Sequence, residues 1–318
     1  MYQLLRIKAS TPADPRRGYN PPPMAARIID GSGIAAAVKG QVQRRIEQIA
    51  QMGKRVSLTA ILTGASPAGE LYAQRQAEAC RAVGIGYDLL KLPADTTQRE
   101  LKQQIRRLND DANVTGIMMH LPLPAGLDAA RLQYEIDVVK DVEGVNPANI
   151  GYVVYGHTLI APCTALSVIE LIKSTGATIR GAEAVVVGAS EIAGKPIALL
   201  LAEQMATVTL CHIATRDLAA HTRRADILVV AVGKAGLITA DHVRDGAIVV
   251  DVGINRITLP DGTKKTVGDV DFDAIKQKAA HITPVPGGVG PMTVAMLLKN
   301  TLRSAEILYK LTNERGDA

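Results

Sequence analysis

Residues 184–194 read AVVVGASEIAG, and this stretch decides the class of fold. Its first four residues are apolar, which predicts a strand that is buried on both faces. The chain then turns through small residues into a helix that opens near Lys195-Pro196. Proline fits there because the N–H that it lacks would have no partner in the first helical turn. A buried strand followed by a tight loop and a helix is typical of parallel α/β sheets.

Three more apolar runs follow at Val208–Cys211, Ile227–Val232 and Ala247–Val252. A helix over Ala165–Ser174 precedes the first strand, so helices and strands alternate. This alternation predicts a parallel sheet with helices on both faces. We therefore expect residues 162–293 to form a doubly wound, Rossmann-type domain.

The N-terminal half alternates in the same way. Strands are predicted at Val56–Thr63, Ile85–Leu92 and Gly116–His120, and helices at Ile34–Ile49, Leu71–Val83 and Thr97–Leu108. We expect a three-layer α/β domain over residues 24–161, completed by a C-terminal helix within 294–318 and separated from the second domain by a cleft. Residues 1–23 are basic and end in prolines, which predicts a disordered extension, with a transit peptide as the alternative.

Composition narrows the class of protein. A length of 318 residues suits two domains of ordinary size. An aromatic fraction of 3% without any Trp disfavours nucleic-acid binding by base stacking, and the formal charge of +5 is spread among acids. The apolar runs are too short to span a membrane. Three cysteines without C-x-x-C spacing predict neither a disulfide framework nor a metal site, and they favour the cytoplasm.

Residues 188–194 predict a pyrophosphate site, because they place backbone N–H groups and a helix N-terminus together. The spacing is Gly-x-Ser-x-x-x-Gly and not Gly-x-Gly-x-x-Gly, so an ordinary strand-to-helix turn is an equal alternative for this motif alone. Small residues at the ends of later strands strengthen the dinucleotide interpretation. The candidate cofactor-binding residues are Gly188, Ala189, Ser190, Ile192, Gly194, Lys195, His212, Ile213, Thr215, Ala231, Val232, Gly233, Asp251, Gly253 and Ile254.

The segment after the second Rossmann strand bears on which dinucleotide is bound. An acid there would grip the ribose hydroxyls of NAD, but residues 211–216 read CHIATR. A 2′-phosphate could be bound by His212, Thr215, Arg216 or Lys195. These residues favour NADP as the cofactor, with NAD as the alternative.

Several motifs carry a resemblance to a known family: GAS at 188–190, GAIVVDVGIN at 246–255, VGDV at 267–270 and ITPVPGGVGPMT at 282–293. Together with LPLP at 121–124 and KDV at 140–142, they resemble the methylenetetrahydrofolate dehydrogenase/methenyltetrahydrofolate cyclohydrolase family over nearly everything from Met24 onward. The resemblance implies two α/β domains that flank a cleft, a homodimer, a nicotinamide dinucleotide as cofactor and a reduced folate as substrate.

Three positions on the folate side depart from the family pattern. The family has a Tyr and a Lys four residues apart on one helix, where this chain has Tyr72 and Gln76. His120 replaces a family Gln, and Glu143 replaces an Asp that holds the pterin. The resemblance implies that these four residues are the catalytic set, with Tyr72 orienting the pterin. It also implies that the substrate is bound by Tyr72, Leu121, Pro122, Glu143, Pro286, Gly287, Gly288 and Val289.

The dehydrogenase and cyclohydrolase reactions need different catalytic groups. Removing hydride from a carbon between two nitrogens leaves a stabilised cation, so orientation and electrostatics suffice without a base. Hydrolysis of the methenyl ring needs a group that titrates near neutral pH, and the amide of Gln76 is not one. The sequence therefore predicts a dehydrogenase with weak or lost cyclohydrolase activity. The alternatives are a bifunctional enzyme with His120 as acid and base, and a catalytically silent folate- or nucleotide-binding protein.

Overall fold

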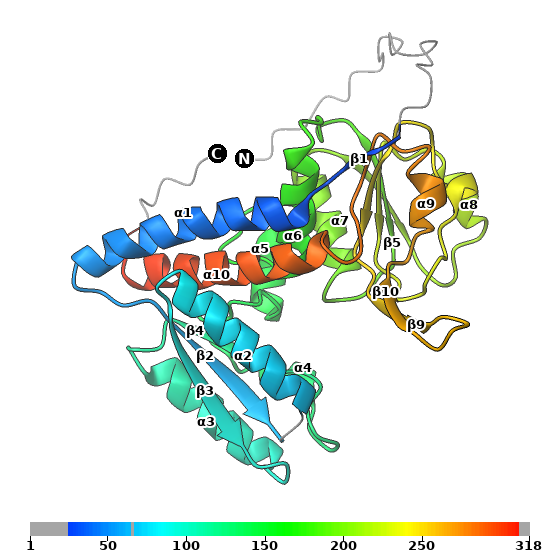
Figure 1. The fold of residues 1–318 in the computed structure, drawn as a ribbon. Helices are drawn as coiled ribbons and strands as arrows, with labels where there is room; N and C mark the ends of the chain where they lie inside the picture. Colours follow the sequence, from blue (N-terminus) through cyan, green and yellow to red (C-terminus); the bar gives the residue numbers. More distant parts are fainter. Residues whose placement is uncertain (1–24, 65–66, 312–318) are drawn as a thin grey trace.

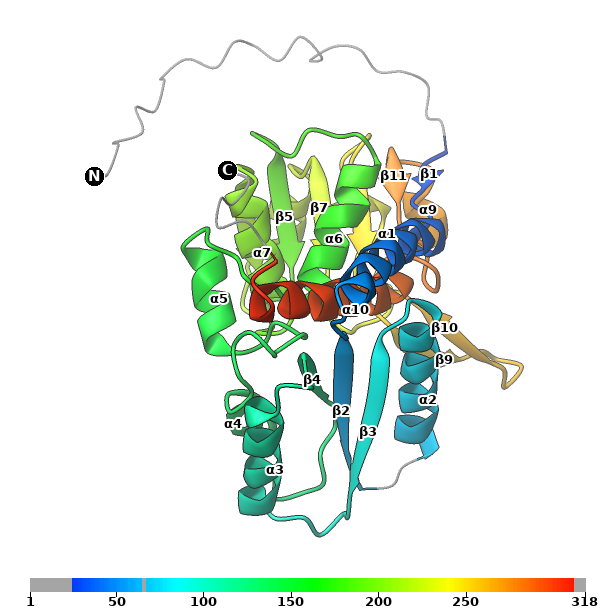
Figure 2. The same ribbon diagram turned by 90° about the vertical axis from the view of Figure 1, so that its left-hand side faces the viewer.

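The computed structural model describes residues 25–64 and 67–311, so the extension expected at residues 1–23 lies outside the described part. Two α/β bodies lie on opposite sides of a pair of long helices, α1 (Gly31–Gln51) and α10 (Val289–Leu308) (Figure 1). The turned view places the smaller sheet below these helices and the larger sheet above them (Figure 2). The predicted fold class, two α/β domains with parallel sheets, is confirmed. Among the described residues, none of the helices combines the length and the apolar character that a membrane crossing needs.

The smaller sheet has three parallel strands in the order β3-β2-β4. Its central strand β2 (Ser57–Thr63) is buried along almost its whole length, between β3 (Gly86–Leu92) and β4 (Gly116–Met119). Helices α2 (Pro67–Ala82) and α3 (Gln98–Asp110) flank the sheet (Figure 2). Because a parallel sheet aligns the carboxyl ends of its strands, the residues that follow β2 and β4 lie at one edge.

The larger sheet has six parallel strands in the order β1-β11-β8-β7-β5-β6. The strands are β1 (Arg27–Ile28), β5 (Glu183–Val187), β6 (Thr207–Cys211), β7 (Ile227–Val230), β8 (Ile248–Asp251) and β11 (His281–Ile282). The chain runs from β5 outward to β6 and then returns to β7 on the other side, so the strand order reverses between β5 and β7. Ligands of doubly wound sheets bind in the crevice at this reversal.

Shorter elements complete the two bodies. They are α4 (Ala129–Gln133), α5 (Pro147–Val154), α6 (Cys163–Ser174), α7 (Gly194–Glu203), α8 (Leu218–Thr222), η1 (Ala240–His242), α9 (Phe272–Ile275) and the antiparallel hairpin of β9 (Asn255–Thr258) and β10 (Lys264–Val267). The hairpin was not predicted, although residues 260–262 read PDG, which is a strong turn signal.

Helices α1 and α10 pack against each other and connect the two sheets (Figure 1). Their contact at the N-terminal ends is so close that a Cβ on Gly31 would lie 1.9 Å from the carbonyl oxygen of Gly288. Further along α10, the side chain of Asn300 donates to the carbonyl oxygens of Val142 and Ala161, each at 2.9 Å. Helix α10 therefore ties the segment that follows β4 to the segment that leads into the second domain.

Two boundaries differ from the sequence-based expectation. Helix α10 begins at Val289 and not at 294, because Pro291 falls in its first turn, where a proline costs no hydrogen bond. The sequence assigns residues 24–161 to the first domain, yet β1 pairs with β11 at the edge of the larger sheet. A two-residue strand has no periodicity of its own, so pattern analysis could not find it.

The Asn300 hydrogen bonds generate a prediction about stability. Asn300→Ala removes the donor of the buried Ala161 carbonyl and leaves the Val142 carbonyl with only the Cys163 thiol at 3.3 Å, and we expect the free energy of unfolding to fall by about 1 to 3 kcal/mol. Urea denaturation followed by circular dichroism measures the change. The control is Lys299→Ala at a half-exposed neighbour, which should stay within about 0.5 kcal/mol. Equal effects of the two variants would contradict the role given to Asn300.

Candidate active site

Two adjoining cavities form the cleft between the domains. The first, of about 650 Å³, lies at the carboxyl ends of β2 and β4. The second, of about 540 Å³, lies between α2 and the first turns of α10 and also reaches Val252 and Ile254 of the other domain. Tyr72, Met118 and Glu143 line both cavities. The two cavities are therefore one continuous site that contains residues of both sheets.

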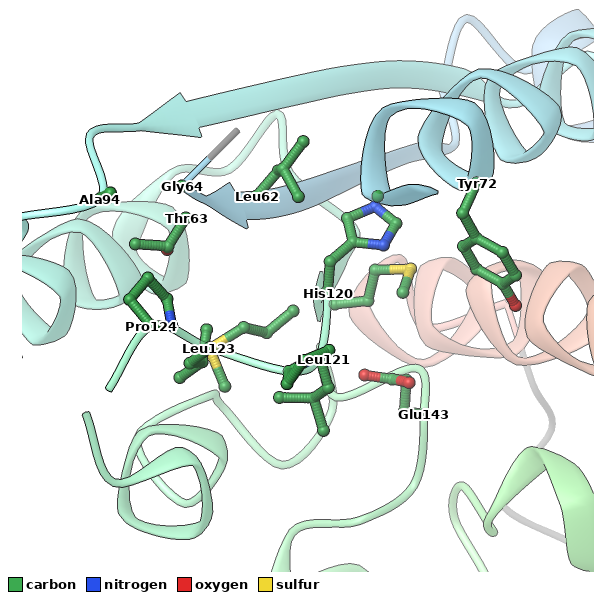
Figure 3. Close-up of a pocket in the computed structure, with 14 residues that line it drawn as sticks. Leu62, Thr63, Gly64, Tyr72, Ala94, His120, Leu121, Leu123, Pro124 and Glu143 are labelled. Atoms are coloured by element: carbon green, nitrogen blue, oxygen red, sulfur yellow. The ribbon is translucent and has the colours of Figure 1, made fainter. Parts of the chain in front are cut away.

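Tyr72 and His120 face each other across the first cavity (Figure 3). Their rings meet edge to face, with centroids 5.8 Å apart and an interplanar angle of 87°. His120 follows β4 and is held by a hydrogen bond of 2.9 Å from its backbone N–H to the carbonyl oxygen of Ile61. Burial lowers the pKa of His120, so its ring is neutral at pH 7. Within the described part of the chain, the buried Nε2 of His120 has no hydrogen-bond partner.

Gln76 is bonded to the wall of the second cavity. Its side chain is 5% exposed. The amide oxygen accepts a hydrogen bond of 3.0 Å from the Tyr87 hydroxyl, and the amide nitrogen donates to the sulfur of Met118 at 2.6 Å. Gln76 is four residues from Tyr72 on α2, as the helical spacing requires for residues on one face. Both of its polar atoms are thus already engaged by protein groups.

Glu143 is the acidic side chain of the cleft. It lines the first cavity (Figure 3) and also the second. Burial raises its pKa to about 7, with a further contribution from the charge of Asp141, while a hydrogen bond with the Met119 backbone acts in the opposite direction. Asp141 is fixed beneath it by N–H donors of Gly144, Asn146 and Asn149, at 3.1, 2.7 and 3.0 Å. Glu143 can therefore be a neutral donor or an anion close to neutral pH.

The predicted pyrophosphate loop lies at the reversal of the larger sheet and has the geometry that such a ligand needs. Gly188 directly follows β5 and has a φ of 112°, and a Cβ there would lie 2.1 Å from the carbonyl oxygen of Ala231. A Cβ on Gly194, the first residue of α7, would lie 1.7 Å from the carbonyl oxygen of Gly188. Only glycine permits this tight turn, which brings the loop 189–193 to the positive end of the α7 dipole. The N–H groups of Gly194 and Lys195 already donate to the hydroxyl and carbonyl oxygens of Ser190, at 3.4 and 3.0 Å, so a pyrophosphate there would be met by the helix dipole and the loop. The residues present therefore fit a dinucleotide.

The residues after β6 form a compact turn next to this loop. The backbone N–H of His212 donates to the Thr215 hydroxyl at 2.8 Å, and the N–H of Thr215 donates to the His212 carbonyl at 2.8 Å. The N–H of Ala214 donates to Nδ1 of His212 at 3.2 Å. Ile213 at the apex is fully exposed, as is most of Ile192 on the neighbouring loop. These two side chains are apolar walls of the kind that the low aromatic content predicts.

The residues after β7 are held by an acid beneath them. The N–H groups of Val232 and Gly233 both donate to Oδ2 of Asp269, at 2.7 and 3.0 Å. Asn255 donates to the other carboxylate oxygen at 2.9 Å. Asp269 therefore fixes the backbone of the predicted cofactor-binding segment 231–233, a role that the sequence analysis missed.

Asp251 is placed differently from what the sequence predicts. Its side chain is 2% exposed and accepts hydrogen bonds from the backbone N–H groups of Gly253, Asp269 and Val270 at 2.9 to 3.0 Å. Burial raises the pKa of Asp251 to about 6. A carboxylate used in this way supports the loop that carries Ile254 and presents no free oxygen to a cofactor.

The structure gathers most predicted folate-side residues in the cleft, including Tyr72, Gln76, His120, Leu121, Pro122, Glu143 and Val289. Pro286, Gly287 and Gly288 do not line either cavity, and the start of α10 provides Gly290, Pro291, Thr293 and Val294. The reason is the close approach of α1, where Gly31 lies against Gly288. Arg75 and Met118 line the site without having been predicted, although helical spacing from Tyr72 could have indicated Arg75.

A doubly wound sheet with a glycine-constrained loop at its reversal, joined across a cleft to a second α/β body, defines a two-domain dinucleotide-binding protein. Family profiles are consistent with this class. Residues 29–143 match the tetrahydrofolate dehydrogenase/cyclohydrolase catalytic domain, and residues 162–309 match the NAD(P)-binding domain of the same family. The chain belongs to the tetrahydrofolate dehydrogenase/cyclohydrolase family, as its sequence motifs predict.

Individual relatives match nearly their whole length. The bifunctional protein FolD of Moorella thermoacetica is 48% identical over 282 residues, which are 89% of this chain and 99% of the relative. The crystal structure of the bifunctional enzyme FolD from Campylobacter jejuni has a TM-score of 0.85 at 42% identity and covers 89% of this chain and 99% of its own. The FolD structure from Trypanosoma brucei, complexed with NADP cofactor and inhibitor, has a TM-score of 0.83 at 37% identity and covers 89% and 98%.

The pKa of Glu143 gives a prediction about pH. A carboxyl whose pKa is higher in the folded chain than in the unfolded chain stabilises the fold less as pH rises between the two values. Between about pH 5 and about pH 8 we expect the wild type to lose unfolding free energy relative to Glu143→Gln. Urea denaturation across this range measures the difference. The matched control is Glu100→Gln, because the Thr97 hydrogen bonds lower the pKa of Glu100 and its titration lies below the range. Parallel curves for the wild type and Glu143→Gln would contradict the assignment.

Proposed function

We propose that this protein oxidises 5,10-methylenetetrahydrofolate to 5,10-methenyltetrahydrofolate by hydride transfer to a nicotinamide dinucleotide. The observation that carries the proposal is the continuity of the cleft. One cavity wall holds Tyr72 and Glu143, and the opposite wall is Val252 and Ile254 at the edge of the dinucleotide domain. A substrate on the first wall and a cofactor on the second would meet without crossing solvent. The named activities of the relatives support the same reaction class.

The folate side binds and orients the substrate. Tyr72 is 54% exposed, and a pterin or benzoyl ring can pack against its ring. Glu143 can donate a hydrogen bond when it is protonated and accept hydrogen bonds from ring N–H groups when it is ionised. The bound dinucleotide supplies the hydride acceptor. Because the nitrogens of the substrate stabilise the cation that remains, these residues need only position the bridge carbon and exclude water.

Hydrolysis of the methenyl product makes a different demand, which Gln76 does not meet. Water must attack the carbon and a proton must move to a nitrogen, so a titratable group is required. Gln76 has no titratable atom, and its amide is engaged by Tyr87 and Met118. We therefore propose that cyclohydrolase activity is weak or lost.

His120 supports a second candidate function, in which both activities persist. Its Nε2 is buried at the first cavity and has no partner among the described residues, so it could exchange a proton with bound water or substrate. Its neutral ring at pH 7 is the form that a general base needs. The two candidate functions differ in a single proton transfer by His120, which mutation of this residue can test.

The family resemblance supports two further proposals, that the chain works as a homodimer and that it is located in the cytoplasm. Cys80, Cys163 and Cys211 are free thiols in the structure, which is consistent with a reducing compartment.

Hydrolysis of methenyltetrahydrofolate tests the role of Gln76. We expect the purified wild type to hydrolyse this compound no faster than buffer, as followed by loss of its absorbance. Gln76→Lys introduces a titratable amine at the same point of the cavity, and we expect hydrolysis to rise at least about tenfold. The control is Gln74→Lys, which adds the same charge at an exposed position of α2. Wild-type hydrolysis well above the buffer rate would refute the proposal.

His120→Ala separates the two candidates. Under the leading proposal we expect dehydrogenase turnover to change by less than about tenfold, because no proton is abstracted in that step, and no hydrolysis is present to lose. Under the second candidate, the variant would abolish a measurable wild-type hydrolysis while sparing hydride transfer. The two rates are measured from reduced nicotinamide formed and methenyl compound consumed. A loss of dehydrogenase turnover by a factor of about a thousand would contradict both candidates, because each leaves hydride transfer independent of His120.

A further inference from the structure

We propose that the turn 212–215 selects a dinucleotide with a free 2′-hydroxyl on its adenosine ribose, so that NAD is preferred over NADP. The inference rests on the proposed function only in assuming that the second domain binds a nicotinamide dinucleotide. It reverses the expectation drawn from sequence, in which His212, Thr215, Arg216 and Lys195 favour NADP.

The turn lies at the end of the second strand of the dinucleotide-binding unit. It follows directly on the carboxyl end of β6, which pairs with β5 at the edge where the glycine loop lies. In doubly wound sheets, the group at the end of the second strand meets the ribose next to the adenine. Residues 212–215 are therefore the part of this chain that would meet either a 2′-hydroxyl or a 2′-phosphate.

Two side-chain acceptors of the turn are already engaged by its own backbone. Oγ1 of Thr215 accepts from the N–H of His212, and Nδ1 of His212 accepts from the N–H of Ala214. The turn contains no Lys or Arg, so a ribose hydroxyl finds hydrogen-bonding groups there while a phosphate finds no permanent counter-charge within the turn.

The side chains at the apex of the turn are apolar. Ile213 is fully exposed and Ala214 is exposed beside it, so the surface offered to the ribose is apolar. A 2′-phosphate placed there would lose hydration without gaining a counter-charge, which is costly. A hydroxyl loses far less, and Ile213 can pack against the adenine ring.

The neighbouring cations do not compensate. Lys195 lies 3.8 Å from Glu191, so its charge is partly balanced. Arg216 stands outside the bonded turn and precedes Asp217, whose carboxylate caps α8 through the N–H of Ala220. Arg216 is the cation that directly follows the turn in sequence, so its removal is one arm of the test.

The experiment is calorimetric titration of the full chain with NAD and with NADP, without folate. We expect NAD to bind at least about tenfold more tightly. Ala214→Arg places a guanidinium at the apex, where a charged hydrogen bond to a phosphate is worth roughly a tenfold or larger gain, so NADP affinity should rise while NAD affinity changes little. Arg216→Ala should leave the ratio of the two affinities within about twofold. Gln74→Arg, in the other domain, is the control for added charge.

Two results would overturn the inference. Tighter binding of NADP that is lost in Arg216→Ala would show that Arg216 reads a phosphate, and it would leave the proposed oxidation standing. Failure of both dinucleotides to bind would remove the proposed function together with the selectivity. Because binding is measured apart from turnover, a defect on the folate side cannot imitate either result.

Discussion

The close packing of α1 against α10 is the constraint on which the rest of the structure depends. At the N-terminal ends of these helices, Gly31 lies so near the carbonyl of Gly288 that no side chain fits between them. Along α10, Asn300 holds the carbonyls of Val142 and Ala161. These contacts fix the smaller sheet relative to the larger one. The width of the cleft, and hence the distance between a bound folate and a bound dinucleotide, follows from them.

The cleft itself is poor in charge, and its chemistry follows from that. Burial keeps the His120 ring neutral at pH 7 and brings the pKa of Glu143 to about 7, while Gln76 carries no charge at all. A substrate that becomes a cation when it loses hydride gains from an anion nearby, and ionised Glu143 is such an anion. The neutral amide of Gln76 is held at the cavity wall by two hydrogen bonds, one from the Tyr87 hydroxyl to its oxygen and one from its nitrogen to the Met118 sulfur.

Much of the fold could be predicted from the sequence, because β2, β5, β7 and β8 are buried on both faces and leave short, nearly continuous apolar runs between helical segments. The two-residue strands β1 and β11 have no such signal and form only because other strands lie beside them. The same distinction applies to the site. Tyr72 and Gln76 follow from helical spacing, whereas the burial of Asp251 beneath its loop depends on backbone groups near residue 269.

By itself, the sequence determined the α/β class, the family motifs and the identities of the departing residues Gln76, His120 and Glu143. These are properties of residue type and local spacing, which the chain carries whether or not it is folded. Tertiary structure alone decided which polar atoms have partners: the amide of Gln76 is bonded to Tyr87 and Met118, while Nε2 of His120 has no partner among the described residues. A hydrogen bond between segments distant in sequence depends on the relative position of whole elements, and only packing fixes that position.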